Sequence, residues 1–294
     1  MSLRIALPPD YDFMHLRRFY GRDPEPTGET IEAQTIRKNI LHRGAPLQLA
    51  LWVDNGYLHA HQQGELPMHD EQFELLVTHL AGLQQNTADF RQQFGNHPDM
   101  GVLIQQAPSL FVPQLMPFEA LSWAIIGQLI SVAAATTIRR RFILLGEQEH
   151  LGLWAYPDAS TTLGLGFDKL RGIGFSATKA RALLAAAETQ LQDPRFLPSS
   201  LAHDTASELS QRLQKIPGIG PWTAQYTLLR GYNHLAGDMS NDLAVRRGLG
   251  ALTTGALTAK EAPTAIQTRQ WLEQFAPYQA LVAAHLWHWQ SQHF

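Results

Sequence analysis

Cysteine is absent from the 294-residue sequence. Disulfide bonds, zinc sites with thiolate ligands and iron–sulfur clusters are therefore excluded, because each of them needs cysteine sulfur. No long hydrophobic run is present either: the most apolar stretch, residues 120–135, contains Ser122 and Gln128 and is too short to span a bilayer. The first ten residues have too short an apolar run for a signal peptide. We therefore expect a cytoplasmic protein with no membrane partner.

Charged residues are few and unevenly placed. They make up 17% of the chain, and the net charge of −3 argues against a protein that coats itself with nucleic acid. Residues 1–112 contain 8 Lys or Arg against 13 Asp or Glu, whereas residues 113–250 contain 13 against 11. This distribution is consistent with contact to DNA through one limited face of the middle part of the chain.

Three prolines between residues 108 and 117 indicate a domain boundary. Before this boundary, residues 47–62 read as two strands joined at Asn55-Gly56, and Asn-Gly supplies the positive φ angles of a tight hairpin turn. A strand near the N-terminus and a helix over residues 73–83 are also expected. In residues 29–41, apolar and polar side chains alternate only loosely. The sequence therefore predicts an α+β domain with an antiparallel sheet over residues 1–112.

Behind the boundary the sequence becomes almost wholly helical. Residues 118–145 predict one long helix that is apolar at first and basic towards its end. Further helices are expected over residues 161–170 and 177–191 and in the C-terminal part of the chain. The sequence therefore predicts an all-helical domain over residues 113–294.

Residues 205–231 predict two helices joined by a tight hairpin. Pro217-Gly218-Ile219-Gly220 ends the first helix, because proline disfavours a helical residue before it and glycine permits positive φ. Pro221 is suited to the first position of the second helix. The free N–H groups and the positive dipole end at that helix start favour a phosphate ligand. An ordinary helical hairpin, in which the glycines only make the turn, is the alternative.

Two aromatic residues follow the hairpin on one face of the second helix. Trp222 and Tyr226 are four residues apart, so their rings lie one above the other, and Trp287 on the last helix can oppose them. Core packing is the ordinary explanation for such rings. The alternative is a wall on which a flat, electron-poor ligand stacks, since aromatic faces attract cations.

Asp242 is the acidic residue that follows this segment, 22 residues after Gly220. We expect Ser240 or Asn241 to cap the next helix, which places Asp242 in its first turn, where the helix dipole favours a carboxylate. A structural first-turn acid is the alternative. A functional role requires a permanently negative group beside a developing positive charge.

These residues carry a resemblance to a known family. The string LQKIPGIGPWTAQYTLLRG, followed by the aspartate of SNDLAVRRGL, resembles the helix-hairpin-helix DNA glycosylases, and most of all the bacterial DNA-3-methyladenine glycosylases II. FEALSWAIIGQLISVAAATTIRRRF is similar to the long central helix of that branch, and LPPDYDFMHLRRFYGR is similar to its opening. Residues 28–105 match more weakly.

The resemblance implies a monofunctional glycosylase of base excision repair. Such an enzyme flips an alkylated purine of the 3-methyladenine type out of double-stranded DNA and excises it by hydrolysis. It implies that Asp242 is catalytic. The residues implied to line the base pocket are Trp222, Tyr226, Trp287 and Phe19. Those implied to contact DNA are Gly218, Gly220 and Thr223, which hold a phosphate through backbone N–H groups, and Leu129, which fills the gap left by the extruded nucleotide.

Related glycosylases that also cut the strand use a lysine early in the second helix of the hairpin. Residues 221–226 contain none, so we expect no strand cleavage. We expect a monomer without a cofactor. The sequence leaves open whether carbonyl oxygens of the hairpin hold a monovalent cation.

Three alternatives are weighed against this function. Leu243 and Tyr278 stand where the family has an aromatic residue and a tryptophan, so the substrate could instead be hypoxanthine or an oxidised base. A non-catalytic protein could use the hairpin only to bind DNA. A metal site could use His285, His288 and His293, but no acidic residue lies near them on the terminal helix, and we expect no metal.

Overall fold

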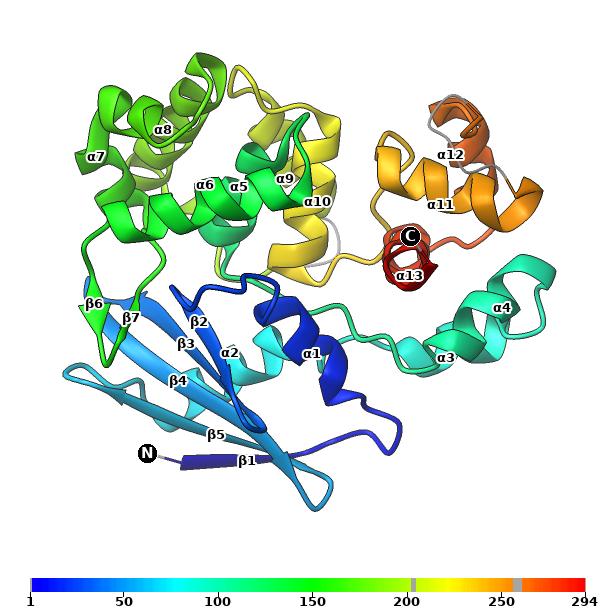
Figure 1. Ribbon diagram of the computed structural model, residues 1–294, viewed down its shortest axis with the longest axis horizontal. Helices are drawn as coiled ribbons and strands as arrows, with labels where there is room; N and C mark the ends of the chain where they lie inside the picture. The colour runs from blue at the N-terminus through cyan, green and yellow to red at the C-terminus, as the bar shows by residue number, and fades with distance from the viewer. Residues whose placement is uncertain (1, 202–204, 256–260, 294) are drawn as a thin grey trace.

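The computed structural model describes residues 2–201, 205–255 and 261–293. Its N-terminal part contains a five-stranded antiparallel sheet with the strand order β1-β5-β4-β3-β2 (Figure 1). The strands are β1 (Ser2–Ala6), β2 (Glu29–Glu32), β3 (Thr35–His42), β4 (Ala45–Asp54) and β5 (Tyr57–Gly64). The predicted hairpin is confirmed, because β4 pairs with β5 across Asn55 and Gly56, whose φ angles are 47° and 78°.

Strand β3 was hard to identify in the sequence because both of its faces are buried. Lys38 and Asn39 point to opposite faces, and they are 1% and 0% exposed. Asn39 Nδ2 donates hydrogen bonds to the carbonyl groups of His150 and Leu153, at 2.7 and 2.8 Å. Polar side chains at buried positions on both faces remove the alternation that usually marks a strand.

Helices form most of the remaining chain. They are α1 (Phe13–Tyr20), α2 (Asp70–Leu80), α3 (Thr87–Phe94), α4 (Pro98–Gln106), α5 (Pro117–Gly127), α6 (Val132–Leu145), α7 (Ala159–Gly172), α8 (Ala177–Gln192), α9 (Thr205–Gln214), α10 (Pro221–Tyr232), α11 (Leu243–Thr254), α12 (Ala265–Glu273) and α13 (Gln279–His293), with a short 3-10 helix at Pro194–Phe196. A small hairpin of β6 (Glu149–His150) and β7 (Leu153–Trp154) lies against the sheet.

The predicted fold class is therefore confirmed: an α+β N-terminal part is followed by helices. The hairpin of β6 and β7 is an addition to the part that was expected to be all-helical. Among the helices described, none is long and apolar enough to cross a membrane.

Residues 118–145 form two helices, so the prediction of one long helix is wrong. Helices α5 and α6 are separated by residues 128–131. Leu129 has a φ of 57°, which no right-handed helix accommodates. Ser131 then caps α6 by accepting a hydrogen bond from the Ala134 N–H at 3.2 Å. The break places Leu129 in a loop on the surface, with its side chain fully exposed.

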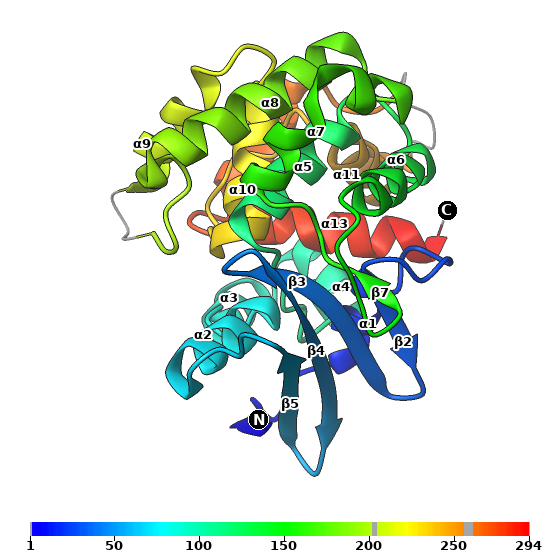
Figure 2. The ribbon, with the colours of Figure 1, turned by 90° about the vertical axis from the view of Figure 1, so that its left-hand side faces the viewer.

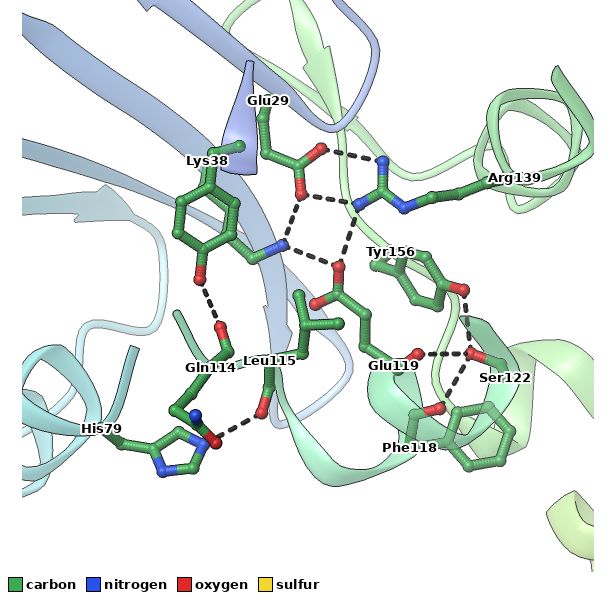
Figure 3. A network of polar contacts seen from close by, with 11 residues as sticks. Glu29, Lys38, His79, Gln114, Leu115, Phe118, Glu119, Ser122, Arg139 and Tyr156 are labelled. Atoms are coloured by element: carbon green, nitrogen blue, oxygen red, sulfur yellow. Dashed lines mark hydrogen bonds and ion pairs between the residues drawn. The ribbon is translucent and has the colours of Figure 1, made fainter. Parts of the chain in front are cut away.

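A buried network of four charged side chains joins the sheet to α5 and α6 (Figure 3). Lys38 Nζ donates to Oε1 of Glu29 at 2.7 Å and to Oε1 of Glu119 at 2.9 Å. Arg139 donates to the same two carboxylates at distances between 2.6 and 2.9 Å. All four side chains are at most 4% exposed. Two cations therefore neutralise two carboxylates inside the protein.

Each charge in this network depends on its partners. Burial raises the pKa of Glu29, but Arg139 and Lys38 outweigh burial and hold the pKa of this carboxyl far below its ordinary value. Burial lowers the pKa of Arg139, and Glu29 and Glu119 outweigh it, so that pKa is raised. The network thus ties the sheet to α5, the helix that ends at the loop of Leu129.

The C-terminal helix α13 lies between α11 and α4, which Figure 1 and Figure 2 show above and below it. It packs against α11 of the helical part and against α4 of the N-terminal part. Contacts therefore cross the predicted boundary near residue 112, both at α4 and in the charged network. The division into domains of residues 1–112 and 113–294 stays a prediction.

Candidate active site

The predicted hairpin lies between α9 and α10. Gly218 has a φ of 94°, and a Cβ atom there would come within 3.1 Å of Ala182 and 3.2 Å of Thr178 on α8. Glycine therefore meets two demands at this position, a left-handed backbone and a close contact. Gly220 is the N-cap of α10, and the first hydrogen bond of the helix runs from the Ala224 N–H to its carbonyl. Earlier N–H groups have no acceptor within the helix, as in known phosphate sites.

Gln128 connects this hairpin to the loop between α5 and α6. Its Nε2 donates hydrogen bonds to the carbonyl of Gly218 at 3.0 Å and to Oγ1 of Thr223 at 2.8 Å. The next residue is the fully exposed Leu129. The structure therefore holds the predicted wedge residue next to the predicted phosphate-binding residues.

Asp242 is the N-cap residue of α11, so the prediction that Ser240 or Asn241 caps this helix is wrong. Oδ1 of Asp242 accepts a hydrogen bond from the Val245 N–H at 2.9 Å. The helix begins at Leu243, so Asn241 and Ser240 lie one and two residues too early to cap it. Asp242 is half-buried. The cap position fixes the aspartate backbone at the start of the helix and turns its carboxylate onto the helix N-terminus.

Two predicted pocket residues donate directly to this carboxylate. The indole Nε1 of Trp222 lies 2.8 Å from Oδ2 of Asp242, and Nε1 of Trp287 lies 3.1 Å from Oδ1. With the backbone N–H of Val245, three donors hold the carboxylate in one orientation. Residues from three separate helices, α10, α11 and α13, therefore meet at one acidic group.

The rings form a continuous cluster behind Asp242. The centroid of Tyr226 lies 5.4 Å from that of Trp222 and 5.9 Å from that of Trp287, in tilted contacts. Trp123 of α5 donates its indole N–H to the Tyr226 hydroxyl at 2.9 Å. The sequence prediction that these rings share one site agrees with this geometry, and Trp123 extends the cluster into α5.

Phe19, at the end of α1, reaches the cluster through arginine side chains. The Arg230 guanidinium lies 4.5 Å from the ring centre of Phe19, 5.7 Å from that of Trp287 and 6.0 Å from that of Tyr226. Arg22 lies 4.2 Å from the ring centre of Phe19. Phe19 therefore contacts cations already present in the protein.

The chain matches no protein-family model. It is 26% identical over 211 residues to DNA-3-methyladenine glycosylase 1 of Schizosaccharomyces pombe, in an alignment that spans 71% of this chain and 84% of that protein. It is 27% identical over 196 residues to DNA-3-methyladenine glycosylase 2 of Escherichia coli, with 64% of each chain aligned.

The chain is similar to the helix-hairpin-helix DNA glycosylases of the 3-methyladenine type. The resemblance found in the sequence is thus confirmed. The 3-methyladenine DNA glycosylase of Archaeoglobus fulgidus has the same fold, with a TM-score of 0.80 over 99% of this chain and 98% of that one, at 19% identity. An 8-oxoguanine glycosylase/lyase of Clostridium acetobutylicum shares the fold at a TM-score of 0.69 and 12% identity. Fold alone therefore does not separate the reactions found in this superfamily.

Sequence reasoning missed three residues of the cluster: Arg22, Trp123 and Arg230. Arg22 and Trp123 come from segments outside the hairpin. Arg22 and Arg230 are of a residue type that is usually found on the surface. Only Trp123 had a signal, because it lies in FEALSWAIIGQLISVAAATTIRRRF, the string that is similar to the long central helix of the family.

The positions that departed from the family pattern lie at different distances from the cluster. Leu243, the first residue of α11, is 44% exposed beside Asp242. Tyr278 packs on Phe90 and Phe94 of α3, away from the rings around Asp242.

The histidines of α13 do not form a metal centre within the described part of the chain, where no group of three His, Cys, Asp or Glu residues could hold a metal ion. His285 is buried, and His288 contacts the ring of His15 at 4.8 Å between centroids. The side chain of His293 lies outside the described residues.

Proposed function

We propose that this protein is a monofunctional, monomeric DNA glycosylase that hydrolyses the N-glycosidic bond of alkylated purines of the 3-methyladenine type in double-stranded DNA. The observation that carries the proposal is the half-buried carboxylate of Asp242, oriented by the indole N–H groups of Trp222 and Trp287. The names of the S. pombe and E. coli relatives support the same substrate class.

The carboxylate has a defined role in this reaction. As the bond between the sugar and the base breaks, the deoxyribose becomes an oxocarbenium-like cation. A negative charge fixed in advance stabilises that cation without reorganisation, and Asp242 can also accept a proton from the attacking water. The two indole donors leave the carboxylate little rotational freedom. In this mechanism its oxygens therefore keep one orientation while the sugar becomes cationic.

Other parts of the site bring the nucleotide to this carboxylate. The N–H groups at the start of α10 bind a phosphate of the damaged strand. Leu129 enters the duplex and occupies the space of the extruded nucleotide, which offsets part of the few kcal/mol that flipping costs. The rings of Trp222, Tyr226 and Trp287 then stack on the base, and a cationic alkylpurine is attracted to their faces.

The proposal includes no strand cleavage, because no lysine amine is placed to attack the sugar. Residues 221–226 supply no lysine at the start of α10. Lys179 on α8 lies near the hairpin, but its Nζ donates to the carbonyl of Ile126 at 2.9 Å. Burial lowers the pKa of Lys179, yet this hydrogen bond points the amine at α5. Water is therefore the nucleophile in the proposal.

No step of this proposal uses a monovalent cation at the hairpin. The carbonyl of Ile216 accepts from the Ile219 N–H, and that of Gly218 accepts from Gln128. The phosphate site described above needs only N–H groups.

The experiment that tests this function uses a methylated DNA duplex and the full chain. Chromatography of the products is expected to show free 3-methyladenine, and electrophoresis is expected to show intact strands until alkali cleaves the abasic sites. Binding without release of any base would leave a DNA-binding protein and overturn the glycosylase assignment. Strand breaks that form without alkali, together with a covalent enzyme–DNA adduct that borohydride traps, would overturn the monofunctional mechanism.

A further inference from the structure

The sheet carries a hollow on the face opposite to the charged network. Asn39 lies on this face, where it bonds to the hairpin of β6 and β7. Two residues earlier, Arg37 points to the same face and pairs with Ala50 of β4, the central strand (Figure 1). Ala50 is small, and a shallow cavity of about 320 Å³ lies over it. A small side chain on the central strand thus leaves a hollow among larger neighbours.

A flat aromatic side chain forms one wall of this hollow. The residues around Ala50 are Trp52 on β4, Thr35 and Arg37 on β3, and His61 on β5. Trp52 stacks on its cross-strand neighbour His59, with 5.4 Å between the ring centres and 12° between the planes. Both rings are half-buried. The indole is therefore held in one orientation at the edge of the hollow and remains accessible.

Two other walls carry hydrogen-bonding groups. Arg37 donates from Nε to Oε2 of Glu32 at 2.7 Å and from Nη1 to Oε1 of Gln48 at 3.3 Å, so its guanidinium is fixed. Among the described residues Nη2 has no acceptor. Nδ1 of His61 lies 3.3 Å from the hydroxyl oxygen of Ser2, which leaves Nε2 of that ring for a ligand. An aromatic wall beside fixed polar groups suits a flat ligand with polar edges, as a nucleobase is.

An arginine beside the hollow suits the phosphate that accompanies a nucleobase. Arg4 of β1 pairs with His59, and its guanidinium lies 4.2 Å from the ring centre of Tyr57. It is exposed, and it forms no ion pair with any described residue. Of the acids on this face, Glu32 is paired, and Asp54 accepts from the amide of the next side chain at 3.0 Å. The described residues therefore leave Arg4 free to bind an anion.

We propose that the hollow binds a base of single-stranded DNA. The base stacks on Trp52, its polar edge bonds to Arg37 and His61, and a neighbouring phosphate lies at Arg4. A single strand is required, because stacking and pairing cover the faces and edges of bases in a duplex. The choice of DNA rests on the proposed function, in which the protein acts on DNA. This second DNA site is separate from the hairpin between α9 and α10.

The test measures the fluorescence anisotropy of a labelled oligothymidine of about ten nucleotides, a length that one such site covers, with the full chain. Ala50→Leu fills the hollow, and Trp52→Leu removes its aromatic wall. Each is expected to weaken binding at least about 5-fold, since stacking of a base on one aromatic side chain contributes that much or more. Trp52→Phe keeps a ring and is expected to bind within about threefold of the wild type. Ala6→Leu, at an exposed position of β1 on the same face, is the matched control.

The contact of Arg4 with phosphate is tested by salt. Replacing one arginine that binds a phosphate of a single strand is expected to lower the slope of log K against log salt concentration by about 0.7. Arg4→Met is therefore expected to show this change. Arg43→Met, at the exposed turn between β3 and β4, is expected to keep the slope of the wild type. An unchanged slope for Arg4→Met would overturn the placement of the strand on this face.

Competition with a duplex decides where the oligothymidine binds. An excess of undamaged duplex, which occupies the start of α10 in the proposed function, is expected to leave the affinity for oligothymidine unchanged. Displacement by the duplex would overturn the inference, and so would equal affinities of the wild type, Ala50→Leu and Trp52→Leu. A wild type that does not bind oligothymidine would overturn it as well, and that result is expected if the hollow takes a peptide or a sugar.

Release of 3-methyladenine from methylated duplex separates this inference from the proposed function. The variants of the sheet are expected to release the base at the rate of the wild type. Loss of base release in one of the two leucine variants would show damage to its fold, and the other variant together with Arg4→Met then decides. Absence of oligothymidine binding with normal base release overturns the inference alone. Absence of base release in the wild type overturns the proposed function.

Discussion

The indole N–H of Trp123 donates to the hydroxyl oxygen of Tyr226 at 2.9 Å, which joins α5 to α10 behind the acidic group of the site. Tyr226 is only 9% exposed and Trp123 only 7%. The hydroxyl is therefore engaged inside the protein. Its role in the site is to hold two rings in place.

Tyr226→Phe tests this role. The change leaves the buried N–H of Trp123 without an acceptor, which is expected to cost about 1 to 3 kcal/mol of stability. Because the hydroxyl takes no part in the reaction, the barrier to base release is unchanged, and the rate is expected to stay within about threefold of wild type. Thermal unfolding and single-turnover rates measure the two effects. Tyr57→Phe, at the half-buried first position of β5, is the control. A rate loss without loss of stability would show that the hydroxyl acts in the chemistry.

Trp222→Phe removes one of the donors that orient Asp242 and keeps an aromatic ring. A hydrogen bond to a charged group contributes about 1.5 to 3 kcal/mol, so the single-turnover rate is expected to fall roughly 10-fold or more. The dissociation constant for DNA is expected to stay the same. Trp271→Phe is a matched control, because its Nε1 donates to Asp99 at 3.2 Å in another part of the molecule. Equal rates for both variants would contradict an orienting role of Trp222.

Glu119→Gln tests the buried charged network. The variant leaves Lys38 and Arg139 facing a single carboxylate, and breaking a buried ion pair costs about 3 to 5 kcal/mol. For a chain of this length the midpoint of thermal unfolding is expected to fall by roughly 5 to 8 °C. Glu32→Gln breaks an exposed pair with Arg37 and is expected to cost less than about 1 kcal/mol. Similar midpoints for the two variants would contradict the dependence of the fold on the network.

Stability is expected to depend on pH through His285. Burial, with smaller effects of His288 and His15, lowers the pKa of His285 from 6.5 to about 3. The folded state therefore keeps this histidine neutral while the unfolded chain binds a proton below pH 6.5. Stability is complete above that pH and declines as the pH falls towards 3, with about 2 kcal/mol lost at pH 5.

The measurement compares the unfolding midpoints of the wild type and of His285→Gln at pH 7 and pH 5. The variant is expected to lose roughly 3 °C less than the wild type between the two pH values. The exposed His69 provides the control variant His69→Gln, whose pH dependence is expected to match the wild type. If the unfolding midpoint of His285→Gln falls between pH 7 and pH 5 as much as that of the wild type, the burial of His285 is not the cause of the pH dependence.

The sequence predicted those elements that are marked by residues within the element itself. The hairpin of β4 and β5 was predictable because Asn55-Gly56 sits between two strand-forming runs. The break between α5 and α6 was not, because no proline marks it and Leu129 adopts its positive φ where Gln128 binds the distant Gly218. Likewise the cap of α11 was not predictable, because Ser240, Asn241 and Asp242 are three capping residues in succession and the sequence does not show at which of them the helix begins.

The candidate site was predictable to a smaller extent. Spacing placed Trp222 and Tyr226 on one helix face, and the family resemblance added Asp242 and Trp287. Nothing in the sequence indicated the hydrogen bonds that join them, since these form between three helices. Arg22 could not be predicted, because an arginine without an anionic partner is expected on the surface.

The central claim is that a fixed carboxylate at residue 242 stabilises the cationic sugar. Asp242→Asn and Asp158→Asn provide the most direct test, because both aspartates cap helices but only Asp242 accepts from tryptophan side chains. Single-turnover release of 3-methyladenine is predicted to fall at least about 100-fold in Asp242→Asn, with unchanged affinity for DNA, and to be unaffected in Asp158→Asn. Release by Asp242→Asn at the rate of the wild type would contradict the account.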